Sequence, residues 1–326
     1  MSTGSADLLI EGEAPLEEPG GGPGTAIAAR SPLALFWRRL RSDRVALAAL
    51  AFIIVLIVVA VLAPVIRKVL GAPPPNLQDS TTLDDFGTPT GPSSAHFMGV
   101  DDVGRDVFSR VLYGARVSLQ VSLVATGIAV VVGTVAGMVA GYYRGWADTL
   151  ISRVIDVLLA FPILLLGLGL GSACSVEGCL GFIRPGIGVV TFIIAFSTWT
   201  YFARIIRGQV LSMREKEFIE ASKSLGASDR RIIFREILPN LVAPIIVYST
   251  LIIPTNILLE AALSFLGVGV KAPNPSWGQM IADATSIFDT AWWYMLFPGI
   301  ALLLTVLAFN LVGDGLQDAL NPKSGR

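Results

Sequence analysis

The run VALAALAFIIVLIVVAVLAPVI, residues 45–66, decides the fold of this chain. It contains no charged or amide side chain, and a single proline near its end is its only helix breaker. An α-helix needs roughly 20 apolar residues to cross the hydrocarbon core of a membrane, which is about 30 Å thick. The run meets that length, so we predict a transmembrane helix here.

The composition of the whole chain agrees with this helix. Of its 326 residues, 53% are hydrophobic and only 15% are charged, and the mean hydropathy is +0.68, whereas soluble domains carry about 25% charged residues. Too few polar residues remain to cover a soluble surface. Further windows qualify as spans or nearly so, and we therefore predict an all-α integral membrane protein with six transmembrane helices. These windows are residues 117–142, 150–170, 186–202, 241–266 and 294–312.

The spans divide the chain into an arm, loops and a core. The first residues are acidic and rich in Gly and Pro, which is typical of disorder. The predicted parts are a largely disordered arm (1–44), a first span (45–67), an outer loop with an amphipathic segment (68–116), a five-helix core (117–312) containing a loop at 204–240, and a tail (313–326). We expect the rings of Trp292, Trp293 and Tyr294 in the interface belt of the membrane.

The positions of the basic residues predict the orientation. Placing both termini in the cytoplasm puts seventeen of the 24 Lys and Arg residues on the cytoplasmic side. Cytoplasmic loops of membrane proteins carry an excess of Lys and Arg, so we predict a multi-pass protein with both termini inside. The net charge of −1 then results from basic residues on the cytoplasmic side that are offset by acidic residues, many of them in the outer loop and the N-terminal arm. It does not indicate a nucleic-acid partner.

The inventory of reactive side chains is small. His96 is the one histidine, and Cys174 and Cys179 are the two cysteines. This disfavours a Ser-His-Asp triad, a His-rich metal site and a haem with paired His ligands, so we predict no catalytic and no metal site. The two cysteines lie in a predicted outer loop, where an oxidising exterior permits a disulfide. Two free thiols are the alternative.

The loop at residues 204–240 carries an amphipathic pattern. A short helix around Glu217–Leu225 would place Phe218, Ala221 and Leu225 on one face, with Gly226 as its C-terminal stop. A basic loop beside a membrane also fits contact with anionic lipid.

The residue pattern of this loop points to a partner protein. Residues 220–222 (EAS), followed by Gly226 and then Leu238-Pro239, resemble the EAA loop of ABC importer permeases. Ser222 replaces the second alanine of that motif, and Glu236 stands where the family has isoleucine. In the family the loop forms a coupling helix that docks into a groove on a cytoplasmic ATPase. The resemblance places this role on Glu217, Phe218, Glu220, Ala221, Ser222, Leu225 and Gly226.

Three more stretches are similar to dipeptide and oligopeptide permeases. Residues 99–119 look like their GxDxxGRDxxSRxxxGxRxSL stretch, residues 260–278 like their LSFLGLG…PxPSWG block, and residues 310–322 like their C-terminal signature. The similarity runs from about residue 38 to the end. Within the dipeptide/oligopeptide/nickel family, the chain resembles the six-span C-type subunit.

This resemblance implies a type I importer permease fold in a bacterial plasma membrane. It also implies a B-type permease partner, two cytoplasmic ATPase domains that hold ATP and Mg, and a substrate-binding protein outside. The chain has no G-x-x-x-x-G-K-[ST] motif, so we predict no bound cofactor and no enzymatic activity of its own. Peptides, di- or oligopeptides, are the predicted substrates, and nickel or other small solutes are the alternative. An ion-driven secondary transporter, which predicts internal repeats, would leave the coupling loop without a purpose.

Polar residues inside the spans are the candidates for a translocation path. Ionisable groups in a membrane are costly and are functional candidates by default. Asp156, Asn256 and Glu260 stand out. The structural alternatives are a pair between Asp156 and Arg153 and a hydrogen-bonding role for Asn256 between two helices. Glu260 would lie near the outer mouth, facing a peptide α-ammonium or a basic residue of a partner.

Overall fold

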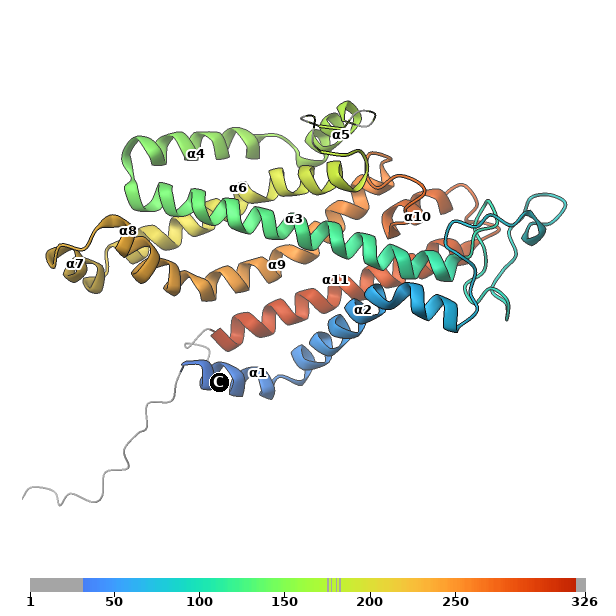
Figure 1. Ribbon diagram of the computed structural model, residues 1–326, viewed down its shortest axis with the longest axis horizontal. Coiled ribbons are helices and arrows are strands. Elements are labelled where there is room, and N and C mark those ends of the chain that lie inside the picture. Colours follow the sequence, from blue (N-terminus) through green and yellow to red (C-terminus); the bar gives the residue numbers. More distant parts are fainter. Residues whose placement is uncertain (1–31, 175, 177, 180, 182, 321–326) are drawn as a thin grey trace, which may run out of the picture.

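The computed structural model describes residues 32–174, 176, 178, 179, 181 and 183–320. They form an elongated helical bundle (Figure 1), and among them strand pairing is limited to isolated bridges, which confirms the all-α class. Most of the predicted arm and the end of the predicted tail lie outside the described residues. The elements are α1 (Pro32–Ser42), α2 (Arg44–Val69), η1 (Ser80–Thr82), α3 (Val107–Tyr143), α4 (Gly145–Ala160), α5 (Ile163–Ala173), α6 (Ile187–Arg214), α7 (Glu217–Ser224), α8 (Asp229–Arg231), the π-helical turn η2 (Ile232–Ile237), α9 (Leu238–Phe265), α10 (Trp277–Ala284) and α11 (Trp292–Leu320).

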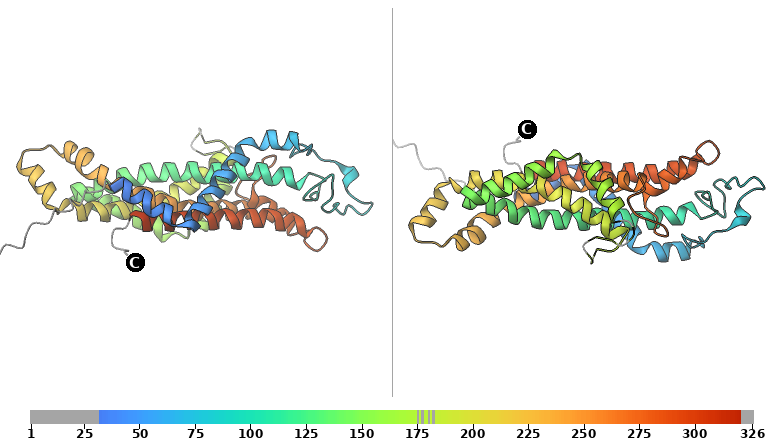
Figure 2. Two further views of the ribbon diagram at one scale, coloured as in Figure 1. Left: turned by 90° about the horizontal axis from the view of Figure 1, so that it is seen from below. Right: turned by 90° about the horizontal axis from the view of Figure 1, so that it is seen from above.

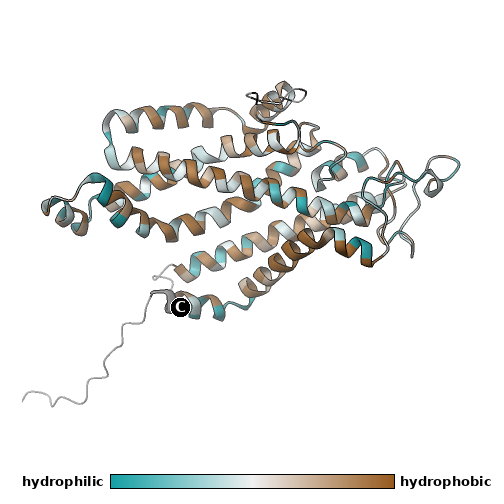
Figure 3. Ribbon diagram, in the orientation of Figure 1, coloured by the Kyte–Doolittle hydropathy of each residue, from teal (hydrophilic) through white to brown (hydrophobic). Residues whose placement is uncertain are grey.

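Five helical stretches of the described chain are long and apolar enough to cross a membrane. They are α2, α3, α6, α11 and the continuous helix formed by α8, η2 and α9. Figure 3 shows their largely apolar lengths, with polar residues gathered toward the two ends of the bundle. The predicted integral membrane class is therefore confirmed.

The third predicted span, residues 150–170, is not a single helix. Two helices, α4 and α5, occupy this region and are bent by 87° relative to each other. Pro162 has no backbone N–H to continue the helix, and it favours the extended backbone seen at Phe161 (φ −83°, ψ 132°). The described residues provide six spans only if this bent pair is counted as one.

The most extensive contact between described helices joins α3 and α6. Gly133, Gly137 and Gly141 recur every four residues and so lie on one face of α3. A Cβ added at Gly137 would lie 2.6 Å from the carbonyl oxygen of Ala203, and the other two glycines approach the α6 backbone equally closely. Small residues at such spacing let two membrane helices pack backbone to backbone.

An ordered cap precedes α3 at one end of the bundle, where the chain from α2 to α3 folds back. The Asp106 carboxylate accepts a hydrogen bond from the Ser109 N–H (2.8 Å) and thereby caps α3. The buried Asp101 carboxylate binds Arg105 at 2.6 Å and lies 3.5 Å from the buried Arg110 guanidinium. His96 contacts Asp106 through Nδ1 at 3.0 Å. These polar contacts satisfy charges that would otherwise be buried without partners.

The prediction of an aromatic belt is wrong for two of its three rings. Trp292 is half exposed, but Trp293 and Tyr294 are buried in the cap. The indole N–H of Trp293 donates to the carbonyl oxygen of Val100 (3.1 Å), and the Tyr294 hydroxyl lies 3.3 Å from an oxygen of Asp283. Burial raises the pKa of the Asp283 carboxyl, against the opposing attraction of the nearby arginines. The rings close the cap because their polar tips find partners inside it.

The glycine contact between α3 and α6 gives a direct test. Gly137→Ala should destabilise the fold by about 1–3 kcal/mol, because its methyl group would overlap the backbone of α6. Gly127→Ala, on the same helix with nothing within 4 Å of the added Cβ, should be neutral or slightly stabilising. Thermal unfolding in detergent would measure both. Equal melting temperatures for the two variants would contradict the close contact.

Candidate functional site

A short helix, α7, projects at the end of the bundle opposite the cap (Figure 1). Glu217 and Glu220 lie in its first turn and Lys223 in its last, where each charge is favourable to the helix dipole. At its C-terminus, the N–H groups of Gly226 and Ala227 donate to the carbonyl oxygens of Lys223 (2.9 Å) and Ser222 (3.0 Å). Gly226 has a φ of +77°, the left-handed conformation this ending requires. The helix thus ends where the sequence predicts.

One face of α7 is anchored and the other is open. Ile219 is fully buried and joins a cluster with Val210, Ile232 and Ile237. Phe218 and Leu225 are 39% and 89% exposed, and Ala221 is exposed as well. The predicted apolar face therefore points away from the chain. The sequence analysis did not predict that Ile219 anchors the helix, because Ile219 lies outside the predicted stripe of Phe218, Ala221 and Leu225. Its apolar side chain was the signal that could have indicated this role.

Polar contacts fix the base of this segment to the bundle. The Tyr142 hydroxyl at the end of α3 donates to an oxygen of Asp229 (2.7 Å). Arg144 binds Glu215 at 2.6 Å, and the Arg214 guanidinium lies 5.6 Å from the Tyr142 ring centroid. Beside α7, a cavity of about 500 Å³ is lined by residues of α8 and η2 and is strongly basic. Its lining residues are Ser228, Arg230, Arg231, Phe234 and Arg235.

Ion pairs join α4 to α6. Arg204 donates to Asp156 at 2.6 Å, so the alternative pair between Asp156 and Arg153 is wrong. Arg207 holds both carboxylate oxygens of Asp148, at 2.5 and 2.8 Å. Asp148 was not among the predicted residues, although its spacing of eight residues from Asp156 puts both on one face of α4. The two pairs differ in exposure: Asp148 is 20% exposed and Asp156 is 52% exposed.

Asn256 and Glu260 lie inside the bundle, one turn apart on α9. Asn256 accepts a hydrogen bond from Thr198 on α6 (2.9 Å) and donates one to Thr126 on α3 (2.8 Å), so it ties three helices together. Glu260 is fully buried, and one of its oxygens accepts a hydrogen bond from Ser264 (2.7 Å). Neither side chain is at a surface in this conformation.

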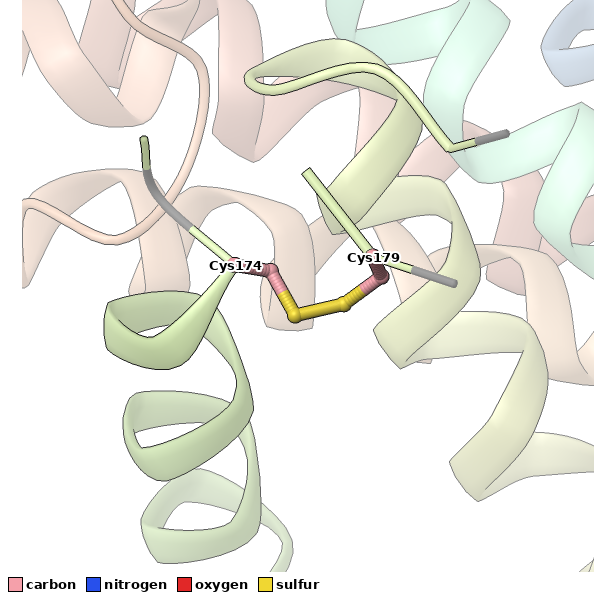
Figure 4. Close-up of a disulfide and its surroundings, with 2 residues drawn as sticks. All are labelled: Cys174 and Cys179. Carbon is pink, nitrogen blue, oxygen red and sulfur yellow. A yellow bond between two sulfur atoms is a disulfide. The ribbon is translucent and has the colours of Figure 1, made fainter. Parts of the chain in front are cut away.

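The two cysteines form a disulfide between the end of α5 and the segment before α6 (Figure 4). Cys174 and Cys179 are both buried and pack against Val190 and Leu263. Cys179 also pairs with Ile183 through two backbone hydrogen bonds of 3.0 Å. The bond ties the C-terminal end of α5 to the segment that leads into α6. Within the residues that the structure describes, no group of three His, Cys, Asp or Glu side chains could hold a metal ion.

A bundle of long apolar helices with a surface helix presented at one polar end is the architecture of a membrane transport subunit. Residues 133–326 match the family described as binding-protein-dependent transport system inner membrane component, and residues 31–84 match the N-terminal TM domain of oligopeptide transport permease C. The chain belongs to this family of transport permeases. The predicted family is therefore confirmed.

Curated relatives resemble the chain over nearly its whole length. It is 41% identical to the dipeptide transport system permease protein DppC of Alkalihalophilus pseudofirmus, covering 92% of this chain and 93% of that protein. It is 45% identical to the glutathione transport system permease protein GsiD of Escherichia coli, covering 90% and 91%. The chain is thus a multi-span permease subunit of a bacterial ABC importer.

The fold agrees with that of a solved importer. The chain is similar to one in the inward-facing MetNI methionine ABC transporter, with a TM-score of 0.53 and 18% identity, covering 65% of this chain and 96% of that one. At this identity the likeness concerns the fold alone, and it confirms the predicted type I permease fold.

The two ion pairs between α4 and α6 should differ in their effect on stability. Asp148→Asn weakens a partly buried two-point contact and should cost about 1–3 kcal/mol. Asp156→Asn breaks a half-exposed pair and should cost less than about 1 kcal/mol. Hydrogen exchange of α4 in the full chain would measure both. Faster exchange in the Asp156 variant than in the Asp148 variant would contradict this ranking.

Proposed function

We propose that this chain forms half of the translocation path of an importer for di- or oligopeptides. The observation that carries the proposal is the near full-length similarity to permeases whose names specify a dipeptide and glutathione, itself a peptide. The solute would be delivered from outside by a binding protein. A second, B-type permease would supply the other half of the path.

We further propose that α7 docks on a partner ATPase in the cytoplasm. The chain lacks a phosphate-binding loop motif of its own, so ATP and Mg would be held by that partner, and this chain would bind no cofactor. Phe218 and Leu225 expose apolar surface beside the exposed Glu217 and Glu220. An apolar patch with a charged rim is the usual anatomy of a protein interface. The basic residues at this end support a cytoplasmic location for it and for both termini.

In this proposal, movement of the ATPases would shift the permease between two states. ATP can do this only if it binds one state better than the other. Ile219 packs α7 against the ends of α6 and η2, and Tyr142 ties the same region to α3. Displacement of α7 would therefore move these helices together. The paired charges between α4 and α6 offer a contact that can separate at lower cost than a packed apolar core.

The ion pair between Asp156 and Arg204 supports an aqueous path along α4 and α6. Both side chains are about half exposed, at 52% and 53%, on helices that are otherwise largely apolar. Exposed charges of this kind face water or a partner rather than lipid. Asn256 and Glu260 are enclosed, and we propose that they set the position of α9 beside this path without touching solute in this state.

The substrate proposal predicts ATP-dependent uptake of peptides. Vesicles would contain this chain with its partner permease and ATPases, and the binding protein would be added outside. Labelled di- and oligopeptides should accumulate only with ATP. Asp156→Asn should lower uptake several-fold without loss of assembly, because it removes a charge from the proposed path.

Nickel ions and free amino acids are the comparison solutes in the same vesicles. Uptake of nickel without uptake of any peptide would refute the substrate class. Normal peptide uptake by the Asp156 variant would refute only its place in the path.

The coupling proposal predicts that α7 can be disabled without harming the fold. Leu225→Ser and Phe218→Ser change exposed side chains, so melting temperatures should stay within about 2 °C, as is usual for surface substitutions. ATP-driven uptake should fall at least tenfold while ATPase activity persists, because the transmitted contact is lost. Phe86→Ser, an exposed aromatic residue in the cap at the opposite end of the bundle, is the matched control. Uptake that falls equally in the control would argue against α7 as the specific contact.

A further inference from the structure

A long apolar groove runs between α2 and α11 on the outside of the bundle. Its volume is about 370 Å³, and it lies toward the end of the molecule that carries α1. The small side chains of Ala48 and Ala308 leave it hollow, and Phe52 and Leu307 form its walls. Its lining is almost wholly apolar, and Arg44 is its one charged lining residue. A groove with this lining suits a hydrocarbon chain.

Arg44 stands at the start of α2 with its guanidinium free to meet a ligand. It is exposed, and within the described part of the chain no ion pair includes it. The nearby Asp43 carboxylate is engaged in capping α2, accepting the N–H groups of Val45 (2.9 Å) and Ala46 (3.0 Å). An arginine beside an apolar groove in a membrane favours an anionic group at the same depth.

The amphipathic helix α1 adds positive charge beside Arg44. Leu40 packs against Ala319 of α11, which places α1 across the end of that helix (Figure 2). Arg38 and Arg41 are exposed, and the Arg41 guanidinium lies 5.6 Å from the centre of the half-exposed Trp37 ring. Tryptophan and arginine on such a helix are typical of the headgroup level of a membrane. Three carboxylates oppose this positive charge: Asp43 beside Arg44, and Asp314 and Asp318, which are exposed on α11 beyond the groove residue Leu311.

We propose that this groove binds one anionic phospholipid from the leaflet on the α1 side of the membrane. An acyl chain would lie along Ala48 and Ala308, and the phosphate would accept charge-assisted hydrogen bonds from Arg44. The surrounding basic residues favour an anionic over a zwitterionic headgroup. This site is separate from α7 and does not depend on the identity of the transported solute.

Native mass spectrometry of the full chain in detergent would test the site. The probes are phosphatidylglycerol and phosphatidylcholine with identical acyl chains. Phosphatidylglycerol should bind the unmodified chain more tightly. Arg44→Gln should weaken phosphatidylglycerol binding about fivefold, the effect of one basic residue near an anionic lipid. It should weaken phosphatidylcholine binding by a smaller factor, because the choline cation offsets the charge of the phosphate. Asp314→Asn should strengthen phosphatidylglycerol binding.

Two matched variants separate the groove from the rest of the surface. Ala48→Phe fills the groove and should weaken both lipids, whereas Val58→Phe, also exposed on α2, should weaken neither. Lys68→Gln removes an exposed charge at the other end of α2 and should leave the lipid preference intact. Equal binding of the two lipids, or equal effects of Arg44→Gln and Lys68→Gln, would overturn the proposal. When the chain is isolated together with its partner permease, loss of that partner in Ala48→Phe with lipid binding unchanged would overturn the proposal, because a protein would then fill the groove.

Discussion

The positions of the other helices depend on the backbone contact between α3 and α6. Glycines at 133, 137 and 141 allow the two helices to approach until only hydrogen atoms separate α3 from the carbonyl groups of α6. Because both helices run the length of the bundle, this contact fixes the relative positions of the segments attached to their two ends. It brings Thr126 and Thr198 within reach of Asn256, so that α9 joins the pair by hydrogen bonds. In a membrane, where apolar surface gains little from burial, such packing and polar contacts hold helices together.

The outer layer of the bundle is held by different forces. Where α4 meets α6, two of the contacts are ion pairs, and one of them is half exposed. Exposed ion pairs contribute little to stability and separate readily in water. In the transport cycle that we propose, the α3–α6 pair would be the rigid part of the subunit, and α4, which leads through a sharp bend into α5, would be the part that moves relative to it.

The sequence alone predicted five of the spans, the short surface helix and the family, because each rests on a local signal: length, periodicity or motif spacing. It could not predict features that depend on which helices touch. Asp156 lies one turn from Arg153, yet its partner is Arg204, which is distant in sequence. Trp293 is buried because the segment between α2 and α3 folds back and offers the Val100 carbonyl group to it. The sequence contains Pro162, but membrane helices tolerate proline. The size of the bend could therefore not be predicted from this residue alone.

The orientation of α7 shows why a subunit of a complex misleads a simple amphipathic analysis. Such an analysis assumes that the apolar face of a helix packs against its own chain. Here the face with Phe218 and Leu225 is exposed, and the single residue Ile219 anchors the helix from the other side. Successive residues on a helix are separated by about 100°, so an apolar residue next to an apolar stripe gives the helix two faces. A short surface helix with two apolar faces can pack only one of them against its own chain. The other face stays exposed, and we expect a partner to bind there.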